Sequence, residues 1–481
     1  MTELHKLTLT EAARLLQARE VSAVEMVGAS LARIEATEPL IKACLTVAGD
    51  QALAEARALD QAGPDPARPL WGLPLTVKDV FLTKGLRTTA ASRYLENYIP
   101  AYDARVVERL RQAGAVVVAK TNLDEFAMGS STEFSAFGPT KNPWNPAKVP
   151  GGSSGGAAAS VAAYQAPGGF GTDTGGSIRQ PACLCGCAGL KPTYGRVSRY
   201  GIVAFASSLD QAGPLARRVR DCAVLLAAVA GPDERDATSS LQPVENYAAA
   251  AARPLAGLRL GLPRELWSAN LDPEVRSVLE AALRTLEGAG VSLVEFSLPS
   301  LKYVVAAYYI LASSEASTNL ARYDGVRYGR RAGGAGGLTE LYVSSRHQFL
   351  GPEVRRRILL GTFALSSGYY EAYFQKAARV RRLIRDDYAR ALADCDFLLA
   401  PVSPLPAWDL GRFVDDPITS YGLDLMTLSV NLAGLPALAF PAGLGPEGGL
   451  PVGLQLIARP FEEMALFSAG LALEEAFPPL L

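Results

Sequence analysis

Two glycine-rich turns in the first half of the chain each present a serine. The first is Pro150-Gly-Gly-Ser-Ser-Gly-Gly156, which contains Ser153, and the second is Gly171-Thr-Asp-Thr-Gly-Gly-Ser177. Glycine lets the backbone approach a ligand closely, and the N–H groups of such a turn can stabilise a developing oxyanion. A serine hydroxyl becomes an effective nucleophile only when a base takes its proton. The chemistry therefore depends on which residue supplies that base.

Histidine, the most common base for a serine nucleophile, is scarce. The 481 residues contain only His5, in the N-terminal tail, and His347, in a polar stretch far from both turns. The sequence therefore offers little support for a Ser-His-Asp triad. We expect a lysine or a carboxylate to act as the base.

Lys78 is the first candidate, because it interrupts the apolar run Leu73–Phe81, which is typical of a buried strand. A fully buried lysine is rare unless it has a role. Burial can lower a lysine pKa from about 10.4 to about 7–8, which would leave a neutral amine able to accept a proton. Two alternatives are an edge-strand lysine that prevents aggregation and an ion pair with Asp79.

The two turns allow other interpretations. A flexible linker is disfavoured because the turns lie inside a helix–strand pattern. No lysine follows either turn, as a Walker phosphate loop requires, and the first turn does not match the Gly-x-Ser-x-Gly elbow. Composition and spacing support a nucleophile site and an anion-binding loop about equally.

The elements around the turns indicate an α/β protein. An expected helix at Ala104–Ala113 precedes the apolar strand Ala115–Ala119, which is typical of a sheet covered by helices on both faces. We expect one large domain over residues 1–481, with N-terminal helices at about 7–37 and surface excursions at about 231–256 and 330–345.

Further elements follow from the hydrophobic pattern. The alanine-rich stretch from Ser153 to about Tyr164 is expected to be helical, which puts the first turn at a helix N-terminus. A long charged helix is expected over about 370–393, followed by a strand at Phe397–Ala400.

Composition excludes several classes of protein. The chain is 49% hydrophobic and 20% charged, an ordinary globular composition, and its net charge of −1 gives no overall attraction to nucleic acid. We see neither a signal peptide nor an apolar run of about 18 residues, so we expect a soluble cytoplasmic protein without a membrane partner.

Three closely spaced cysteines, Cys183, Cys185 and Cys187, do not complete a zinc ligand set, so we expect no metal. We expect these thiols to pack behind the second turn.

The two turns together, over residues 150–156 and 171–182, resemble the amidase signature family. Gly189–Gly201, Phe205–Pro214 and the motifs at 308–319 and 361–370 resemble one branch of it, the A subunits of glutamine-dependent aminoacyl-tRNA amidotransferases. The resemblance covers essentially the whole chain. It implies an α/β fold with a large mixed β-sheet covered by helices on both faces.

The resemblance implies a Ser-Ser-Lys triad. Ser177 matches the nucleophile, Ser153 matches a bridging serine that follows a cis peptide bond, and Lys78 matches the base. The backbone N–H groups from Thr174 to Ser177, which include those of Gly175 and Gly176, are implied as the oxyanion hole.

The resemblance also implies supporting and substrate-binding residues. Ser154, Asp173 and Arg179 belong to the supporting shell. For the substrate glutamine, Arg357 matches the residue that pairs with the α-carboxylate, Asp424 the residue that binds the α-ammonium, and Tyr308 a residue that lines the pocket. Arg355, Arg356 and Arg357 are consecutive, so the carboxylate could be held by a neighbour of Arg357.

The activity implied is that of a glutaminase subunit. It would release ammonia for the conversion of Glu-tRNA(Gln) to Gln-tRNA(Gln), with Asp-tRNA(Asn) left open as a second substrate. The subunit itself would need no cofactor. A partner B subunit would hold tRNA and ATP with magnesium, and a C subunit would clamp A to B in a heterotrimer. The alternatives are a stand-alone amidase and a noncatalytic anion- or nucleotide-binding protein.

Overall fold

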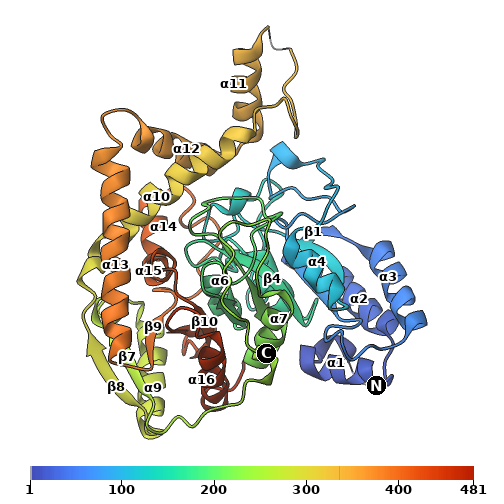
Figure 1. Cartoon of the computed structure of the whole chain (residues 1–481), viewed down its shortest axis with the longest axis vertical. Coiled ribbons are helices and arrows are strands. Elements are labelled where there is room, and N and C mark those ends of the chain that lie inside the picture. Colours follow the sequence, from blue (N-terminus) through green and yellow to red (C-terminus); the bar gives the residue numbers. More distant parts are fainter. Residues whose placement is uncertain (1–2, 335) are drawn as a thin grey trace.

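A mixed β-sheet runs through the molecule, in a computed structural model that describes residues 3–334 and 336–481 (Figure 1). Within those residues the sheet has 11 strands in the order β1-β3-β2-β4-β6-β5-β10-β11-β9-β7-β8. The strands are β1 Cys44–Val47, β2 Pro74–Lys78, β3 Val116–Thr121, β4 Gly168–Asp173, β5 Ala188–Lys191, β6 Gln211–Ala216, β7 Arg259–Pro263, β8 Ser292–Phe296, β9 Phe397–Pro401, β10 Ala437–Leu444 and β11 Pro451–Ile457. The predicted α/β class with a large mixed sheet is confirmed.

Helices cover both faces of this sheet. Neighbouring residues of a strand point to opposite faces, and β10 shows the consequence: Leu438 packs against Gly470, whereas Ala439 packs with Cys183. Gly470 lies on α16 and Cys183 on α6, so these two helices lie on opposite sides of the sheet.

The helices follow the chain in the order shown in Figure 1. They are α1 Leu9–Gln17, α2 Ala23–Ile41, α3 Gly49–Ala62, α4 Arg105–Gln112, α5 Gly155–Ala162, α6 Arg179–Cys185, α7 Val219–Val229, α8 Arg264–Trp267, α9 Pro273–Gly288, α10 Val304–Asn319, α11 Leu338–Phe349, α12 Pro352–Leu365, α13 Lys376–Ala393, α14 Pro417–Leu423, α15 Leu425–Ala433 and α16 Glu463–Ala476. Ser22 and Glu25 form a capping box at the start of α2, as their spacing predicts.

Several expected boundaries shift by a few residues. The strand expected at Leu73–Phe81 ends at Lys78, because the chain then turns and the Phe81 N–H donates to the Lys78 carbonyl. The helix expected from Ser153 begins at Gly155, which leaves Ser153 just outside its N-terminus. The first residues of the helix expected at 370–393 form a separate π-helical turn, Glu371–Gln375.

The two predicted surface excursions differ from each other. Residues 231–256 contain one short 3₁₀ turn, Tyr247–Ala249, and otherwise follow an irregular path. The segment at 330–345 enters α11, which projects from the body (Figure 1). Residue 335 of that segment lies outside the described residues, as do residues 1 and 2.

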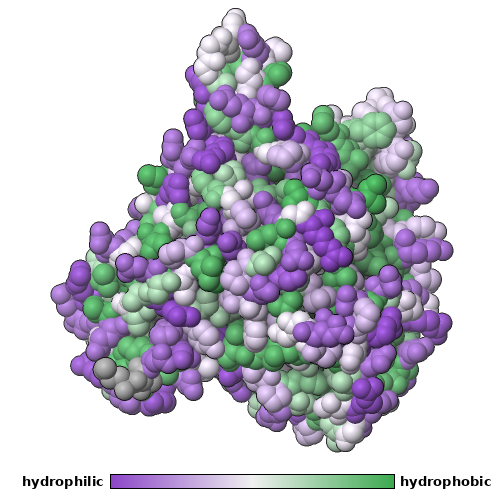
Figure 2. Space-filling model, turned by 180° about the vertical axis from the view of Figure 1, so that it is seen from behind, coloured by the Kyte–Doolittle hydropathy of each residue, from purple (hydrophilic) through white to green (hydrophobic). Residues whose placement is uncertain are grey.

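The surface carries mixed side chains. Figure 2 shows hydrophilic and hydrophobic residues interspersed over the face seen from behind. Across the two described ranges, no helix is both long and apolar enough to span a membrane.

Candidate active site

Lys78 lies at the C-terminal end of β2 and is fully buried. Its Nζ atom is 2.8 Å from Ser153 Oγ, 2.9 Å from Ser154 Oγ and 2.8 Å from Thr172 Oγ1. The alternative interpretations of Lys78 do not fit this position. β2 is an inner strand between β3 and β4, and the Asp79 carboxylate instead pairs with Lys120, 3.0 Å away.

Burial lowers the pKa of Lys78 from 10.5 to about 7, although the carboxylates of Asp124, Asp210 and Asp173 act in the opposite direction. A substantial fraction of Lys78 is therefore neutral near pH 7. A neutral amine has a lone pair that can accept the proton of the Ser153 hydroxyl, which is within hydrogen-bond reach. The geometry and the charge state both suit a general base.

The first serine turn follows this amine. The peptide bond between Gly152 and Ser153 is cis, as the family resemblance implies. Ser154 accepts from Lys78, and its hydroxyl also lies 3.0 Å from the Thr172 carbonyl, on β4. The Ser154 N–H donates to the Ser177 carbonyl at 3.1 Å, which ties the first turn to the second.

Ser177 stands at the end of the second turn and lines a small cavity. It is 8% exposed, and within the described residues its hydroxyl has no hydrogen-bond partner. A substrate carbonyl in the cavity can therefore meet this oxygen directly.

One predicted oxyanion donor, the Gly176 N–H, already has an acceptor within the second turn. The Gly176 N–H donates to Asp173 Oδ1 at 2.8 Å, although Gly176 also lines the cavity. The reason is that the Asp173 carboxylate fills the hollow of the turn. Among the described residues, the N–H groups of Gly175 and Ser177 have no acceptor, and both residues line the cavity. The backbone N–H of Thr174 precedes them in the same turn.

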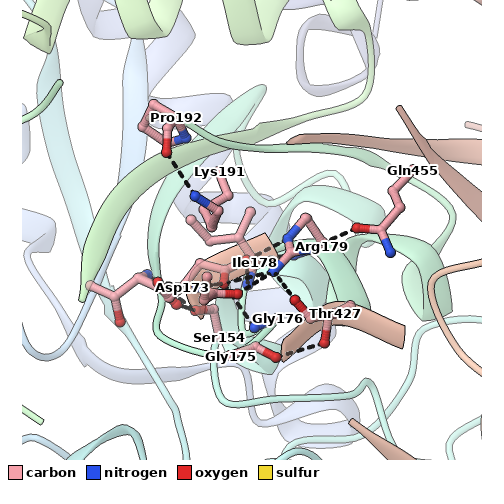
Figure 3. Close-up of polar contacts among 12 residues, drawn as sticks. Ser154, Asp173, Gly175, Gly176, Ile178, Arg179, Lys191, Pro192, Thr427 and Gln455 are labelled. Carbon is pink, nitrogen blue, oxygen red and sulfur yellow. Dashed lines mark hydrogen bonds and ion pairs between the residues drawn. The ribbon is translucent and has the colours of Figure 1, made fainter. Parts of the chain in front are cut away.

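The buried ion pair between Asp173 and Arg179 holds this turn (Figure 3). Arg179 Nε and Nη2 donate to the two carboxylate oxygens at 3.0 and 3.2 Å. Burial alone would raise the pKa of Asp173, but Arg179 brings it down to about 2. Arg179 also donates to Gln455 at 2.7 Å and to Asn431 at 2.6 Å, so its charge is fully surrounded by acceptors.

Glycine is required at two positions of the turn. Gly176 has φ +127°, and a Cβ there would collide with the Thr427 hydroxyl. A Cβ on Gly175 would lie 2.6 Å from the Tyr308 ring. The backbone therefore approaches α10 and α15 as closely as packing allows.

The small cavity above Ser177 brings together the predicted substrate-binding residues. Tyr308 on α10, Arg357 on α12 and Asp424, between α14 and α15, all line it. Arg357 is the member of the arginine run that faces the cavity: Arg356 is 43% exposed, and Arg355 bonds to His347. The described part of the cavity wall thus carries one cation and one anion near the serine.

Burial raises the pKa of Asp424 to about 6, while hydrogen bonds from Ser130 and Tyr309 and the charge of Arg357 oppose that rise. The carboxylate is therefore mostly ionised at pH 7. It is suited to hold an ammonium group, and Arg357 is suited to hold a carboxylate.

Four residues of the site were missed from the sequence. Thr172 contacts Lys78, and Tyr309 and Glu353 contact the charged residues of the cavity. Asp124 packs against Gly152 of the first turn. Glu353 could have been identified from the sequence, because it precedes Arg357 by one helical turn and a glutamate at that spacing can pair with an arginine. The three cysteines predicted to pack behind the second turn are buried there as free thiols.

Known proteins resemble this chain in sequence over essentially its whole length. The Amidase family model matches residues 25–467. The A subunit of glutamyl-tRNA(Gln) amidotransferase from Nitratidesulfovibrio vulgaris (strain DP4) is 57% identical over 482 residues, which cover 100% of this chain and 99% of that protein.

Solved structures agree with these sequence matches. The crystal structure of the A subunit of glutamyl-tRNA(Gln) amidotransferase from Thermotoga maritima superposes with a TM-score of 0.82 at 43% identity, covering 99% of this chain and 96% of that one. The native peptide amidase from Stenotrophomonas maltophilia superposes with a TM-score of 0.83 at 31% identity, covering 98% and 97%. On the matched sequence, the shared fold and the site described above, this chain belongs to the amidase family.

Proposed function

We propose that this chain is the glutamine-hydrolysing A subunit of a tRNA-dependent amidotransferase that converts Glu-tRNA(Gln) to Gln-tRNA(Gln). The observation that carries the proposal is the buried Lys78 amine, 2.8 Å from Ser153 Oγ, beneath a cavity lined by Ser177, Arg357 and Asp424. The full-length similarity to amidotransferase A subunits supports it.

In the proposed mechanism, Arg357 binds the α-carboxylate of glutamine and Asp424 binds the α-ammonium. These contacts direct the side-chain amide toward Ser177. Lys78 takes the proton of Ser153. The Ser177 hydroxyl, which makes no hydrogen bond to Ser153 in this structure, would turn toward Ser153 Oγ and give up its proton, and Ser177 Oγ would attack the amide carbon. The N–H groups of the second turn stabilise the oxyanion that forms.

The tetrahedral intermediate then collapses. The C–N bond breaks, the leaving nitrogen receives the proton that the relay had taken, and ammonia departs. A γ-glutamyl ester remains on Ser177. Water attacks this ester with help from the same relay, which releases glutamate and restores the serine.

The ammonia would pass to a B subunit that holds tRNA and ATP with magnesium, and a C subunit would clamp A to B. This chain would contribute no cofactor of its own and would work in the cytoplasm. Asp-tRNA(Asn) stays open as a second acceptor, since that choice depends on the partner subunits.

The test measures ammonia release from glutamine by the chain alone, with B and C subunits, and with charged tRNA and ATP added. We expect glutaminase activity that increases when the partners and the tRNA are present. A chain that binds neither partner, ignores glutamine and hydrolyses simple aryl amides would instead be a stand-alone amidase.

A further inference from the structure

A second layer of side chains lies behind the two charged residues of the cavity. Glu353 is buried on α12, and its Oε1 accepts from Arg357 Nε at 2.7 Å. The same oxygen accepts from the Tyr421 hydroxyl at 2.7 Å, and the other carboxylate oxygen pairs with Arg356. Glu353 therefore fixes one edge of the Arg357 guanidinium from behind.

The Asp424 carboxylate is held in place in a similar way. The Tyr309 hydroxyl donates to Asp424 Oδ2 at 2.7 Å. The Tyr309 ring stacks on the Tyr421 ring with centroids 3.9 Å apart and planes 18° apart. The Arg357 guanidinium lies 5.0 Å from the Tyr309 ring centroid and 5.2 Å from that of Tyr421, a cation–π arrangement that further limits its movement.

These contacts form a continuous frame, in the order Arg357, Glu353, Tyr421, Tyr309 and Asp424. Opposite charges in a buried pocket attract strongly, and an arginine and an aspartate on flexible side chains would close on each other. Within the residues that the structure describes, no ion pair of 4.0 Å or less joins Arg357 to Asp424, although both line the same cavity. The frame thus holds the two charges apart while both still line the cavity.

We propose that Glu353 and Tyr309 are positioning residues that set substrate specificity by holding Arg357 and Asp424 at the separation of an α-carboxylate and an α-ammonium. The pocket then prefers an amide that carries both groups over an amide that lacks either one. This inference rests on the proposed glutaminase function and extends it to the origin of its selectivity.

Three amide substrates distinguish the part of the frame that holds Arg357 from the part that holds Asp424. Glutamine carries both charged groups, 4-carbamoylbutanoate lacks the ammonium, and 4-aminobutanamide lacks the carboxylate. Steady-state ammonia release is measured for each, using the full-length chain together with the B and C subunits.

Tyr309→Phe keeps the stacked ring and removes only the hydrogen bond to Asp424. Since hydrogen bonds to charged groups have large effects, we expect kcat/KM for glutamine to fall at least about tenfold, mainly through KM. The value for 4-carbamoylbutanoate, which has no ammonium to bind, should change less than about twofold.

Glu353→Gln removes the charge that holds the Arg357 guanidinium. We expect glutamine and 4-carbamoylbutanoate, which both carry the carboxylate, to lose at least about tenfold in kcat/KM. 4-Aminobutanamide should be nearly unaffected. Tyr369→Phe and Glu371→Gln are matched controls, because both residues are exposed and lie outside the frame.

The pattern across substrates decides the proposal. Equal losses for all three amides would indicate a merely structural role and overturn it, as would unchanged kinetics for Tyr309→Phe. That variant alone decides the question if Glu353→Gln does not fold, which thermal unfolding monitored by circular dichroism would show. A wild-type chain that ignores glutamine but hydrolyses neutral amides would contradict the proposed function itself, which is a different outcome.

Discussion

Protonation of Lys78 should control the rate near neutral pH. Its Nζ is completely buried, and its pKa lies at about 7 rather than 10.5. A shift of that size corresponds to about 5 kcal/mol at about 1.4 kcal/mol per pH unit. Because the base works only when neutral, acidification through pH 7 removes it. From Lys78 alone, we expect kcat/KM to be half-maximal near pH 7 and to fall about tenfold for each unit below pH 6.

Asp424 would add a second effect at acid pH, because burial raises its pKa to about 6 and only its ionised form binds an ammonium. The assay therefore compares glutamine with 4-carbamoylbutanoate between pH 5.5 and 9. The fall in kcat/KM caused by protonation of Lys78 should appear with both substrates. The further fall caused by protonation of Asp424 should appear only with glutamine.

Lys78→Arg tests the same reasoning by mutation. An arginine stays protonated over this pH range and cannot accept the Ser153 proton, so we expect kcat to fall at least about 100-fold with no recovery at high pH. Lys84→Arg, at an exposed position, is the matched control. A wild-type profile that is flat from pH 5.5 to 8, or near-normal turnover by Lys78→Arg, would refute the role of Lys78.

The remaining predictions concern the two serine turns. Ser153→Ala should lower kcat for glutamine at least about 100-fold with little change in KM, since it removes the relay and not a substrate contact; a large rise in KM at normal kcat would contradict this. Gly176→Ala should lower the free energy of unfolding in urea by at least about 2 kcal/mol, because φ is +127° and a Cβ would collide with the facing threonine; an unchanged midpoint would count against the strain. Asp173→Asn should cost about 3–5 kcal/mol in the same measurement, because Arg179 stays buried without its carboxylate, and a stable, active variant would show that the ion pair is dispensable.

The candidate catalytic residues were easier to identify from the sequence than the strands that position them. Lys78 was identifiable because a charge in an apolar strand is costly to bury, and the shortage of histidine indicated an unusual base. By contrast, the central strand β4, Gly168–Asp173, was missed because its glycines show no hydrophobic alternation. A Cβ on Gly171 would lie 2.7 Å from Ser154 Oγ, so packing against the first turn selects glycine there.

Other features needed the three-dimensional structure. Three consecutive arginines look alike in the sequence, and only the direction of α12 shows that Arg357 faces the cavity. The hydrogen bond from the Gly176 N–H to Asp173, within the predicted oxyanion turn, could not be read from the sequence. The frame around Arg357 joins residues from three separate helical regions, and no local pattern predicts the stacking of Tyr309 on Tyr421.

The most direct test of the account is to identify the residue that attacks glutamine. The chain is treated with a γ-diazoketone analogue of glutamine, with and without excess glutamine, and the modified peptide is mapped by mass spectrometry. We predict a single label on the Ser177 oxygen, protection by glutamine, and no glutamine hydrolysis by Ser177→Ala. Labelling of another residue, together with continued turnover of glutamine by Ser177→Ala, would contradict the proposed mechanism.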